Sequence, residues 1–186
     1  MMLWIILGIV AVVIIWLAAI FNRLVSLRNQ TLNGWRQIDV QLKRRHDLIP
    51  NLVETVKGGM QFEQTTLTKV IEARNKAMSA QSVGEKAVQE NVLTGALRQL
   101  FALVENYPNL KSNENVAKLQ EELSSTENRI GFARQFYNDI ATQFNIAQQV
   151  FPTNIVAGPF GFKPTELFEI TDVSEKEVPK VDLDIK

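Results

Sequence analysis

The 186-residue sequence contains no cysteine and only one histidine, His46. Disulfides, thiolate nucleophiles and cysteine-based metal sites are therefore excluded. The histidine is not part of an H-E-x-x-H motif, and Lys43 stands where a di-metal helical bundle has a glutamate, three residues before the histidine. A G-x-S-x-G nucleophile motif is also missing. We predict a protein without enzymatic activity, without a cofactor and without an evident small-molecule substrate.

Charge of one sign is not in excess, because 20 Lys and Arg residues balance 20 Asp and Glu residues. The strong basic excess that is typical of nucleic-acid-binding domains is absent, so no nucleic-acid partner is expected. The charges are nevertheless uneven along the chain. Residues 22–80 carry ten Lys and Arg against five Asp and Glu, whereas residues 151–186 carry four against seven.

The first 22 residues contain no charged side chain, and residues 3–21 are almost continuously apolar. About 20 helical residues cross the ~30 Å hydrocarbon core of a bilayer. A cleaved signal peptide is the alternative, but it would have a basic start and a shorter apolar run. We therefore predict an uncleaved transmembrane anchor over residues 1–22, in contact with the lipid bilayer of the cell membrane through residues 3–21. Because Arg23, Arg28 and Arg36 follow the span and no cation precedes it, we expect a short N-terminus outside and the helical body in the cytoplasm.

The rest of the chain has the periodicity of long helices, and no segment alternates for long enough to form a sheet. Apolar side chains at spacings of three and four indicate a helix packed in a bundle or coiled coil. We call a series of positions at these spacings a seam. The longest seam consists of Val116, Leu119, Leu123, Thr126, Ile130, Ala133, Tyr137, Ile140, Phe144, Ala147 and Phe151. A second seam consists of Leu93, Leu97, Leu100 and Val104, and a third of Trp35, Ile38, Leu42, Arg45, Ile49, Leu52, Val56 and Gly59. After a break between residues 57 and 62, the pattern resumes with Phe62, Leu67, Val70, Ile71, Ala77 and Met78.

The predicted fold class is all-α. It comprises a single N-terminal transmembrane helix, an antiparallel bundle of three to four long helices over residues 23–150, and a non-helical C-terminal segment over residues 151–186. Turns are expected at AQSVGE, residues 80–85, and at YPNLKSN, residues 107–113. Ser112 or Asn113 is the expected cap of the last long helix, and Pro152 is expected to stop it.

Pro50 interrupts the first helical pattern after the anchor. If Asp47 is an N-cap, Pro50 falls in the first turn of a new helix, where its missing N–H costs little. Otherwise one helix continues and kinks, because Pro50 cannot donate to the carbonyl of residue 46. Both alternatives make residues 47–51 a joint.

A run of three cations, Lys43, Arg44 and Arg45, precedes this proline. It is either a solvated face, a surface for a partner protein, or part of a buried pair with Asp47 or Glu54. Contact with anionic lipid is disfavoured, because residue 44 would lie ~33 Å beyond the span, several times a Debye length of about 8 Å. Arg45 occupies a seam position and therefore requires a partner. The candidate partner-binding surface or structural joint consists of Lys43, Arg44, Arg45, Asp47, Pro50 and Asn51, and His46 is expected to be an ordinary half-exposed helical residue.

The segment FPTNIVAGPFGFKPTELFEI, residues 151–170, interleaves phenylalanines with prolines and glycines. It is too rich in proline for a long helix and too apolar to remain in water. We expect it to fold back over one end of the bundle, with a docking strip for another protein or subunit as the alternative. The candidate docking residues are Phe151, Pro152, Asn154, Phe160, Gly161 and Phe162. The charged residues after Thr171 are expected to be mobile.

The anchor followed by FNRLVSLRNQTLNGWRQIDVQLKRRHDLIPNLVETVKG, LTKVIEARNKA and FPTNIVAGPFGFKPTELFEI resembles the LemA family of bacterial membrane proteins over nearly the whole chain. The resemblance implies a single-pass membrane protein with an antiparallel bundle of long helices and no established enzymatic activity. It also implies that some relatives act in membrane stress and with membrane proteases or other envelope proteins. The family's motif falls on Trp35, Gln37, Asp39, Lys43, Arg44, Arg45, Asp47, Pro50 and Asn51, and on Pro152, Asn154, Gly161 and Phe162.

The sequence therefore favours a non-enzymatic, membrane-anchored scaffold or adaptor that forms homo-oligomers. Its expected setting is membrane or envelope stress or membrane protein quality control, with a membrane protease as a candidate partner. The alternative is a membrane-associated sensor or signalling protein that uses a kink near Pro50.

Overall fold

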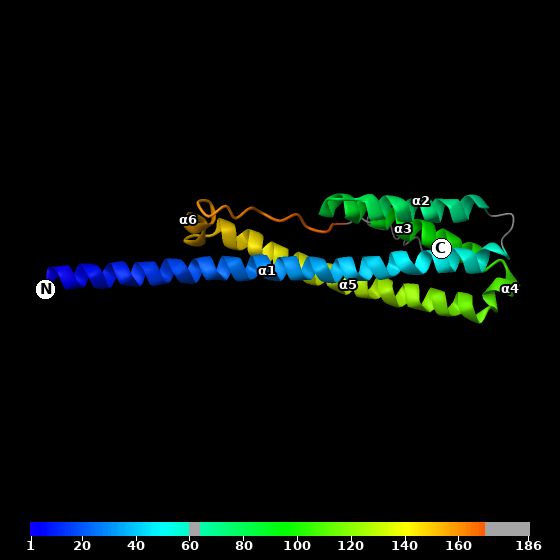
Figure 1. The fold of residues 1–186 in the computed structure, drawn as a ribbon, viewed down its shortest axis with the longest axis horizontal. Coiled ribbons are helices and arrows are strands. Elements are labelled where there is room, and N and C mark those ends of the chain that lie inside the picture. The colour runs from blue at the N-terminus through cyan, green and yellow to red at the C-terminus, as the bar shows by residue number, and fades with distance from the viewer. Residues whose placement is uncertain (60–63, 170–186) are drawn as a thin grey trace, which may run out of the picture.

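The computed structural model describes residues 1–59 and 64–169, which form six helices and no strand. The helices are α1 (Met2–Lys57), α2 (Gln64–Ser79), α3 (Val83–Val104), α4 (Pro108–Lys111), α5 (Glu114–Gln149) and α6 (Thr153–Ala157). Figure 1 shows a long rod in which α5 runs back along α1, while α2 and α3 lie side by side at the end far from the N-terminus. The all-α prediction, with a long apolar N-terminal helix, is confirmed.

The predicted anchor and the first helix of the bundle are one continuous helix of 56 residues. No side chain before residue 20 is even partly buried, and Leu24 is the first that is fully buried. The first part of α1 therefore projects from the bundle as a bare apolar helix (Figure 1). An apolar surface of this length is unfavourable in water, and a bilayer would cover it.

The core consists of three clusters along the rod. The cluster farthest from the projecting end joins α1, α2, α3 and α5, and the middle cluster is built around Ile38, Leu42 and Tyr137. The third cluster includes Leu24, Phe144, Val156 and Phe162 at the base of the projecting helix. The buried side chains of α3 and α5 follow the predicted seams, because each helix presents one apolar stripe to its neighbours.

Several local predictions need correction. Phe151, which was placed at the end of the α5 seam, is 78% exposed because α5 ends at Gln149. Met78 is also exposed. The turn expected over residues 80–85 is shorter, because Ser82 caps a helix that begins at Val83. The short helix α6 lies in the segment predicted to be non-helical. Predictions for Phe62 and for the tail after Thr171 lie outside the described residues.

The strap, residues 163–169, returns from α6 along α5 in extended form (Figure 1). Asn145 exchanges two hydrogen bonds with the backbone of Thr165, at 2.9 and 2.8 Å. Asn138, two helical turns earlier, does the same with Phe168, at 3.1 and 2.8 Å. These side chains satisfy backbone groups that have no strand to pair with, so they fix the path of the strap.

Tyr137 also holds the strap, because its hydroxyl donates to the Glu166 carbonyl at 2.7 Å. Burial, with a smaller contribution from the Glu166 carboxylate, raises the pKa of Tyr137 to about 12. Both causes disfavour the phenolate, so the hydroxyl keeps its proton and donates throughout the neutral pH range. The α1 and α5 helices approach closely at Gly34, because a Cβ atom added to this glycine would lie only 3.3 Å from the Cα atom of Tyr137.

Candidate functional site

Arg45 lies at the centre of a buried ionic cluster formed by three helices, α1, α3 and α5. Its side chain is 3% exposed, and its Nη1 lies 2.9 Å from a Glu127 carboxylate oxygen on α5. The same nitrogen is 3.4 Å from Glu90 on α3, and Nη2 donates to the Thr94 hydroxyl at 2.6 Å. The partner that the seam position requires is therefore supplied by α3 and α5, and not by Asp47 or Glu54.

His46 belongs to the same cluster and is not the half-exposed residue that we expected. Its side chain is 7% exposed, and its Nε2 lies 2.7 Å from Glu90. Glu90 thus bridges two neighbouring side chains of α1, one through each carboxylate oxygen.

The α1 helix continues through Pro50, so Asp47 is not the N-cap of a new helix. Pro50 cannot donate to the His46 carbonyl, which an uninterrupted helix would require. Arg74 of α2 supplies the missing donor, with its Nε 2.7 Å from that carbonyl oxygen. The gap left by the proline is therefore closed by a guanidinium from another helix.

The other members of the charged run lie on the surface. Lys43 and Asp47 are 3.8 Å apart and 76% and 64% exposed, which makes theirs a weak pair. Arg44 lies 3.5 Å from Glu122, and both side chains are about half exposed. Asn51 is exposed and its carbonyl accepts from the Thr55 hydroxyl. The candidate joint therefore divides into an interior part, Arg45 with the neighbouring His46, and a solvated part.

Four residues of this site were not predicted from the sequence: Glu90, Thr94, Glu127 and Arg74. A signal for Glu90 was present, because it lies three residues before Leu93 on the same stripe of α3. Opposite charges at seam positions of two helices are a reason to pair them. The described residues contain no group of three or more His, Asp or Glu arranged to hold a metal ion.

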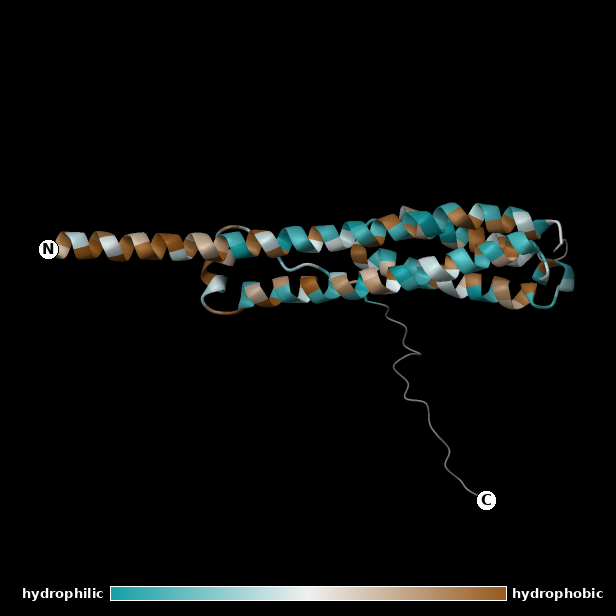
Figure 2. Ribbon diagram, turned by 90° about the horizontal axis from the view of Figure 1, so that it is seen from below, coloured by the Kyte–Doolittle hydropathy of each residue, from teal (hydrophilic) through white to brown (hydrophobic). Residues whose placement is uncertain are grey.

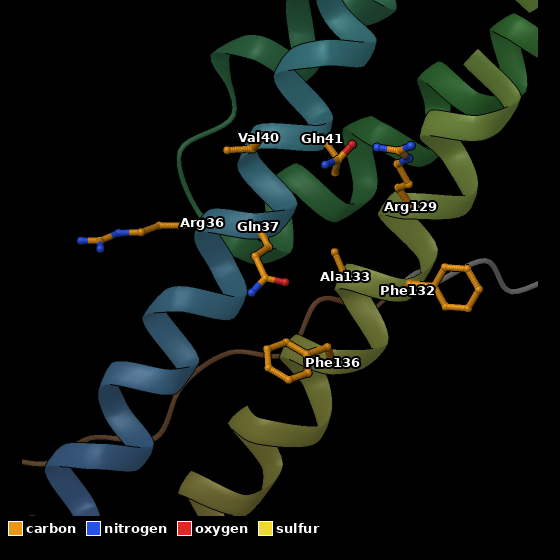
Figure 3. A pocket seen from close by; sticks show the side chains of 8 residues that line it. All are labelled: Arg36, Gln37, Val40, Gln41, Arg129, Phe132, Ala133 and Phe136. Carbon is orange, nitrogen blue, oxygen red and sulfur yellow. The ribbon is translucent and has the colours of Figure 1, made fainter. Parts of the chain in front are cut away.

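A lateral groove of about 590 Å³ runs between α1 and α5 on the outside of the rod. Three exposed apolar residues border it, Val40 on α1 and Phe132 and Phe136 on α5, at 63%, 74% and 45% exposure. Phe136 lies between the helices, whereas Val40 and Phe132 form the outer rims (Figure 3). Figure 3 shows Gln41 and Phe136 directed into the space between the two helices. The Gln41 Oε1 atom is buried without a hydrogen-bond donor among the described residues. The groove thus combines apolar surface with an unused acceptor.

Arg129 and Arg36 also line this groove. Arg129 is directed toward α1, whereas Arg36 lies at the outer rim, with its guanidinium extending away from α5 (Figure 3). The eight lining residues include no carboxylate. No salt bridge joins either arginine to another side chain in the described part of the chain. The groove is therefore both apolar and positively charged.

The candidate docking segment is split by the fold. Phe162 is buried in the cluster at the base of the projecting helix, where it contacts Phe144 and Phe21. Gly161 has a φ of +71°, which a residue with a side chain adopts only with strain. Phe151, Asn154 and Phe160 are exposed, and Pro152 is partly buried.

The sequence model of the LemA family matches residues 34–183. The chain belongs to the LemA family. The match includes the ionic cluster, the proline, the groove and the strap, but not residues 2–33 of α1.

Three curated relatives are similar to this chain. Protein LemA of Metamycoplasma hominis is 29% identical over 167 residues, which cover 88% of this chain and 73% of the relative. Magnetosome protein MamQ 2 of Paramagnetospirillum magneticum is 25% identical over 175 residues, and magnetosome protein MamQ of Magnetospirillum gryphiswaldense is 23% identical over 174. Each of these alignments covers 80% of this chain and 64% of the MamQ protein. The chain is a helical, membrane-associated protein, and LemA proteins are not known as enzymes.

Proposed function

We propose that this LemA protein is a non-enzymatic, membrane-tethered adaptor, whose α1–α5 groove binds an acidic amphipathic helix of a neighbouring membrane protein. The observation that carries the proposal is the groove itself, with exposed apolar walls and two arginines without ion pairs among the described residues. An amphipathic helix lays its apolar face into such a groove, and carboxylates on its rim would neutralise Arg36 and Arg129.

The position of the groove supports this kind of partner. Gln37, midway along the groove, lies 16 residues beyond Phe21 on α1, which is ~24 Å at 1.5 Å per residue. A helix that continues straight out of a neighbouring membrane span reaches this height after about 16 residues. With the short N-terminus outside, the groove would face the cytoplasm. A membrane protease or another factor of membrane protein quality control remains the proposed kind of partner.

The charge of the groove disfavours a symmetric pair of copies at this surface. A two-fold axis through the groove would bring Arg36 and Arg129 of one copy against the same arginines of the other. Like charges at an interface oppose binding. The homo-oligomer expected from the sequence remains a prediction that would have to use another surface.

Site-specific photocrosslinking in native membranes tests the proposal. We expect benzoylphenylalanine at position 136, inside the groove, to join the chain to a juxtamembrane helix that is rich in apolar and acidic residues. The same group at position 92, an exposed position on α3, serves as the control. Arg36→Glu should lower the yield of that adduct several-fold. Lys69→Glu makes the same change of charge at an exposed position on α2 and should leave the yield unchanged.

Two outcomes would contradict the adaptor proposal. One is a set of adducts that is the same from positions 136 and 92 and insensitive to Arg36→Glu. The other is a groove adduct that joins only copies of this chain, which would replace the adaptor with a self-assembling scaffold. If the proposed charge pairing is correct, replacing an acidic residue of the crosslinked partner helix by lysine should restore the yield of the adduct in the Arg36→Glu variant.

A further inference from the structure

The collar, residues 151–162, leaves large apolar side chains uncovered. Phe151, Ile155 and Phe160 are 78%, 58% and 63% exposed. The opposite face of the collar is fully used, since Val156, Ala157 and Phe162 pack on α1 and α5. Three large apolar side chains exposed on one short, firmly packed segment are typical of an interaction surface.

The collar lies at the height where α1 leaves the membrane. The Phe160 ring is 5.0 Å from the ring of Phe21, the last residue of the apolar run. Phe160 and Val156 also border a small apolar pocket with Leu17, Ala18 and Phe21 of α1. The 19 residues of the run, 3–21, span ~28 Å, close to the thickness of the hydrocarbon core. If residues 3–21 cross the bilayer, Phe160 lies at the bilayer surface, beside the last turn of the span.

The charges around the collar suit a lipid surface. Residues 1–38 and 140–165 contain no Asp or Glu, although both signs occur along the rest of the chain. Arg23, Arg28 and Lys163 are exposed in these segments, and the Arg28 guanidinium lies 5.4 Å from the centre of the Phe162 ring. The base of the rod therefore presents apolar side chains beside cations and no carboxylate. Figure 2 shows hydrophobic residues along the projecting part of α1 and again on the turn beside its base.

We propose that the collar is a second membrane contact, in which Phe160 and its exposed apolar neighbours enter the interface of the same bilayer that α1 crosses. Arg23, Arg28 and Lys163 then contact anionic lipid headgroups. Aromatic side chains favour this interface, and cations close to it gain from anionic lipids. The contact fixes the tilt and rotation of the rod, because a helix held at one point can swing whereas a rod held at two points cannot.

The absence of cysteine makes a direct test simple, because one introduced thiol is the only labelling site. The full chain is reconstituted in vesicles of phosphatidylcholine and phosphatidylglycerol, with an environment-sensitive fluorophore on Phe160→Cys. A label on Pro159→Cys reports on the same turn with Phe160 intact, and Val92→Cys on α3 is the matched exposed control. We expect lipids brominated near the headgroup to quench both collar labels several-fold more than the label at position 92.

Replacement of the apolar contact should separate binding from folding. With the label at position 159, the pair Ile155→Asp and Phe160→Asp should abolish the extra quenching, while the thermal unfolding of the bundle in detergent stays the same. Quenching at positions 159 and 160 no stronger than at position 92 would overturn the proposal. A blue-shifted emission that lipids do not quench and that disappears on dilution would overturn it as well, because a second copy would then cover the collar. Purified protein without a partner suffices, so the result is independent of the adaptor proposal.

Discussion

Glu90→Leu is expected to destabilise the folded bundle by about 3–5 kcal/mol, the range for a buried ion pair that loses one partner. The change removes the carboxylate that faces both Arg45 and His46, whose side chains are 3% and 7% exposed. Arg45 keeps only the half-exposed Glu127 as a charged partner. Urea unfolding of the purified chain in detergent micelles, followed by far-UV circular dichroism, measures the effect.

Matched variants decide whether the charge pairing is the cause. Glu121→Leu, on the exposed face of α5, should change the free energy of unfolding by less than about 0.5 kcal/mol. The double variant Arg45→Met and Glu90→Leu should recover much of the loss, because no buried charge is left without its partner. If Glu90→Leu and Glu121→Leu have equal effects, the cluster does not stabilise the contact between α1 and α3.

Arg74→Met is expected to cost about 1–3 kcal/mol, the range for a buried polar group that loses its hydrogen bond. The group in question is the His46 carbonyl, which Pro50 leaves without a helical donor and which Arg74 contacts at 2.7 Å. In a Pro50→Ala background, the alanine N–H can donate to this carbonyl, so Arg74→Met should then cost much less. A double-mutant cycle by urea unfolding measures this coupling.

Lys76→Met, at an exposed position on the same helix, is the control for a lost cation and should be nearly neutral in both backgrounds. Equal costs of Arg74→Met with proline and with alanine at position 50 would show that the guanidinium does not substitute for the missing N–H. Pro50→Ala alone should stabilise the chain, because it restores an interior helical hydrogen bond.

Much of the fold could be predicted from the sequence, because periodicity records which face of a helix is buried. The stripes of α3 and α5 were visible in this way, and the start of α1 was visible as an uninterrupted apolar run. Periodicity does not record what a face meets. Arg45 was recognised as a residue that needs a partner, but Glu90 lies 45 positions away and only the packing of α3 on α1 brings them together.

The same limit applies to the joint and to the strap. Nothing local to DLIPN indicates that Arg74, 28 residues after His46, replaces the donor that Pro50 lacks. Nothing near Asn138 or Asn145 in the sequence indicates that each holds the backbone of an extended segment 30 or 20 residues further on. The groove was also invisible, because it depends on how α1 and α5 pack against each other.

These contacts bear on the choice between an adaptor and a sensor. A sensor that works through Pro50 requires α1 to change direction there. In the structure, α1 is continuous, and Arg74 of α2 donates to the His46 carbonyl that Pro50 leaves without a helical donor. About one turn before the proline, Arg45 contacts Glu127 of α5 and His46 contacts Glu90 of α3. The arrangement favours a rigid rod that presents the groove at a constant height above the membrane.

The most direct test of this rod is a distance across the proline. Spin labels on Lys43→Cys and Lys57→Cys lie on nearly the same exposed face of α1, 14 residues apart, or ~21 Å along a straight helix. Pulsed electron paramagnetic resonance of the chain in lipid nanodiscs should give one narrow distribution near that distance, which broadens when Arg74→Met is added. Two populations, or a broad distribution centred well below this distance, would contradict the rigid rod and favour a hinge at Pro50 if seen in the doubly labelled chain that keeps Arg74.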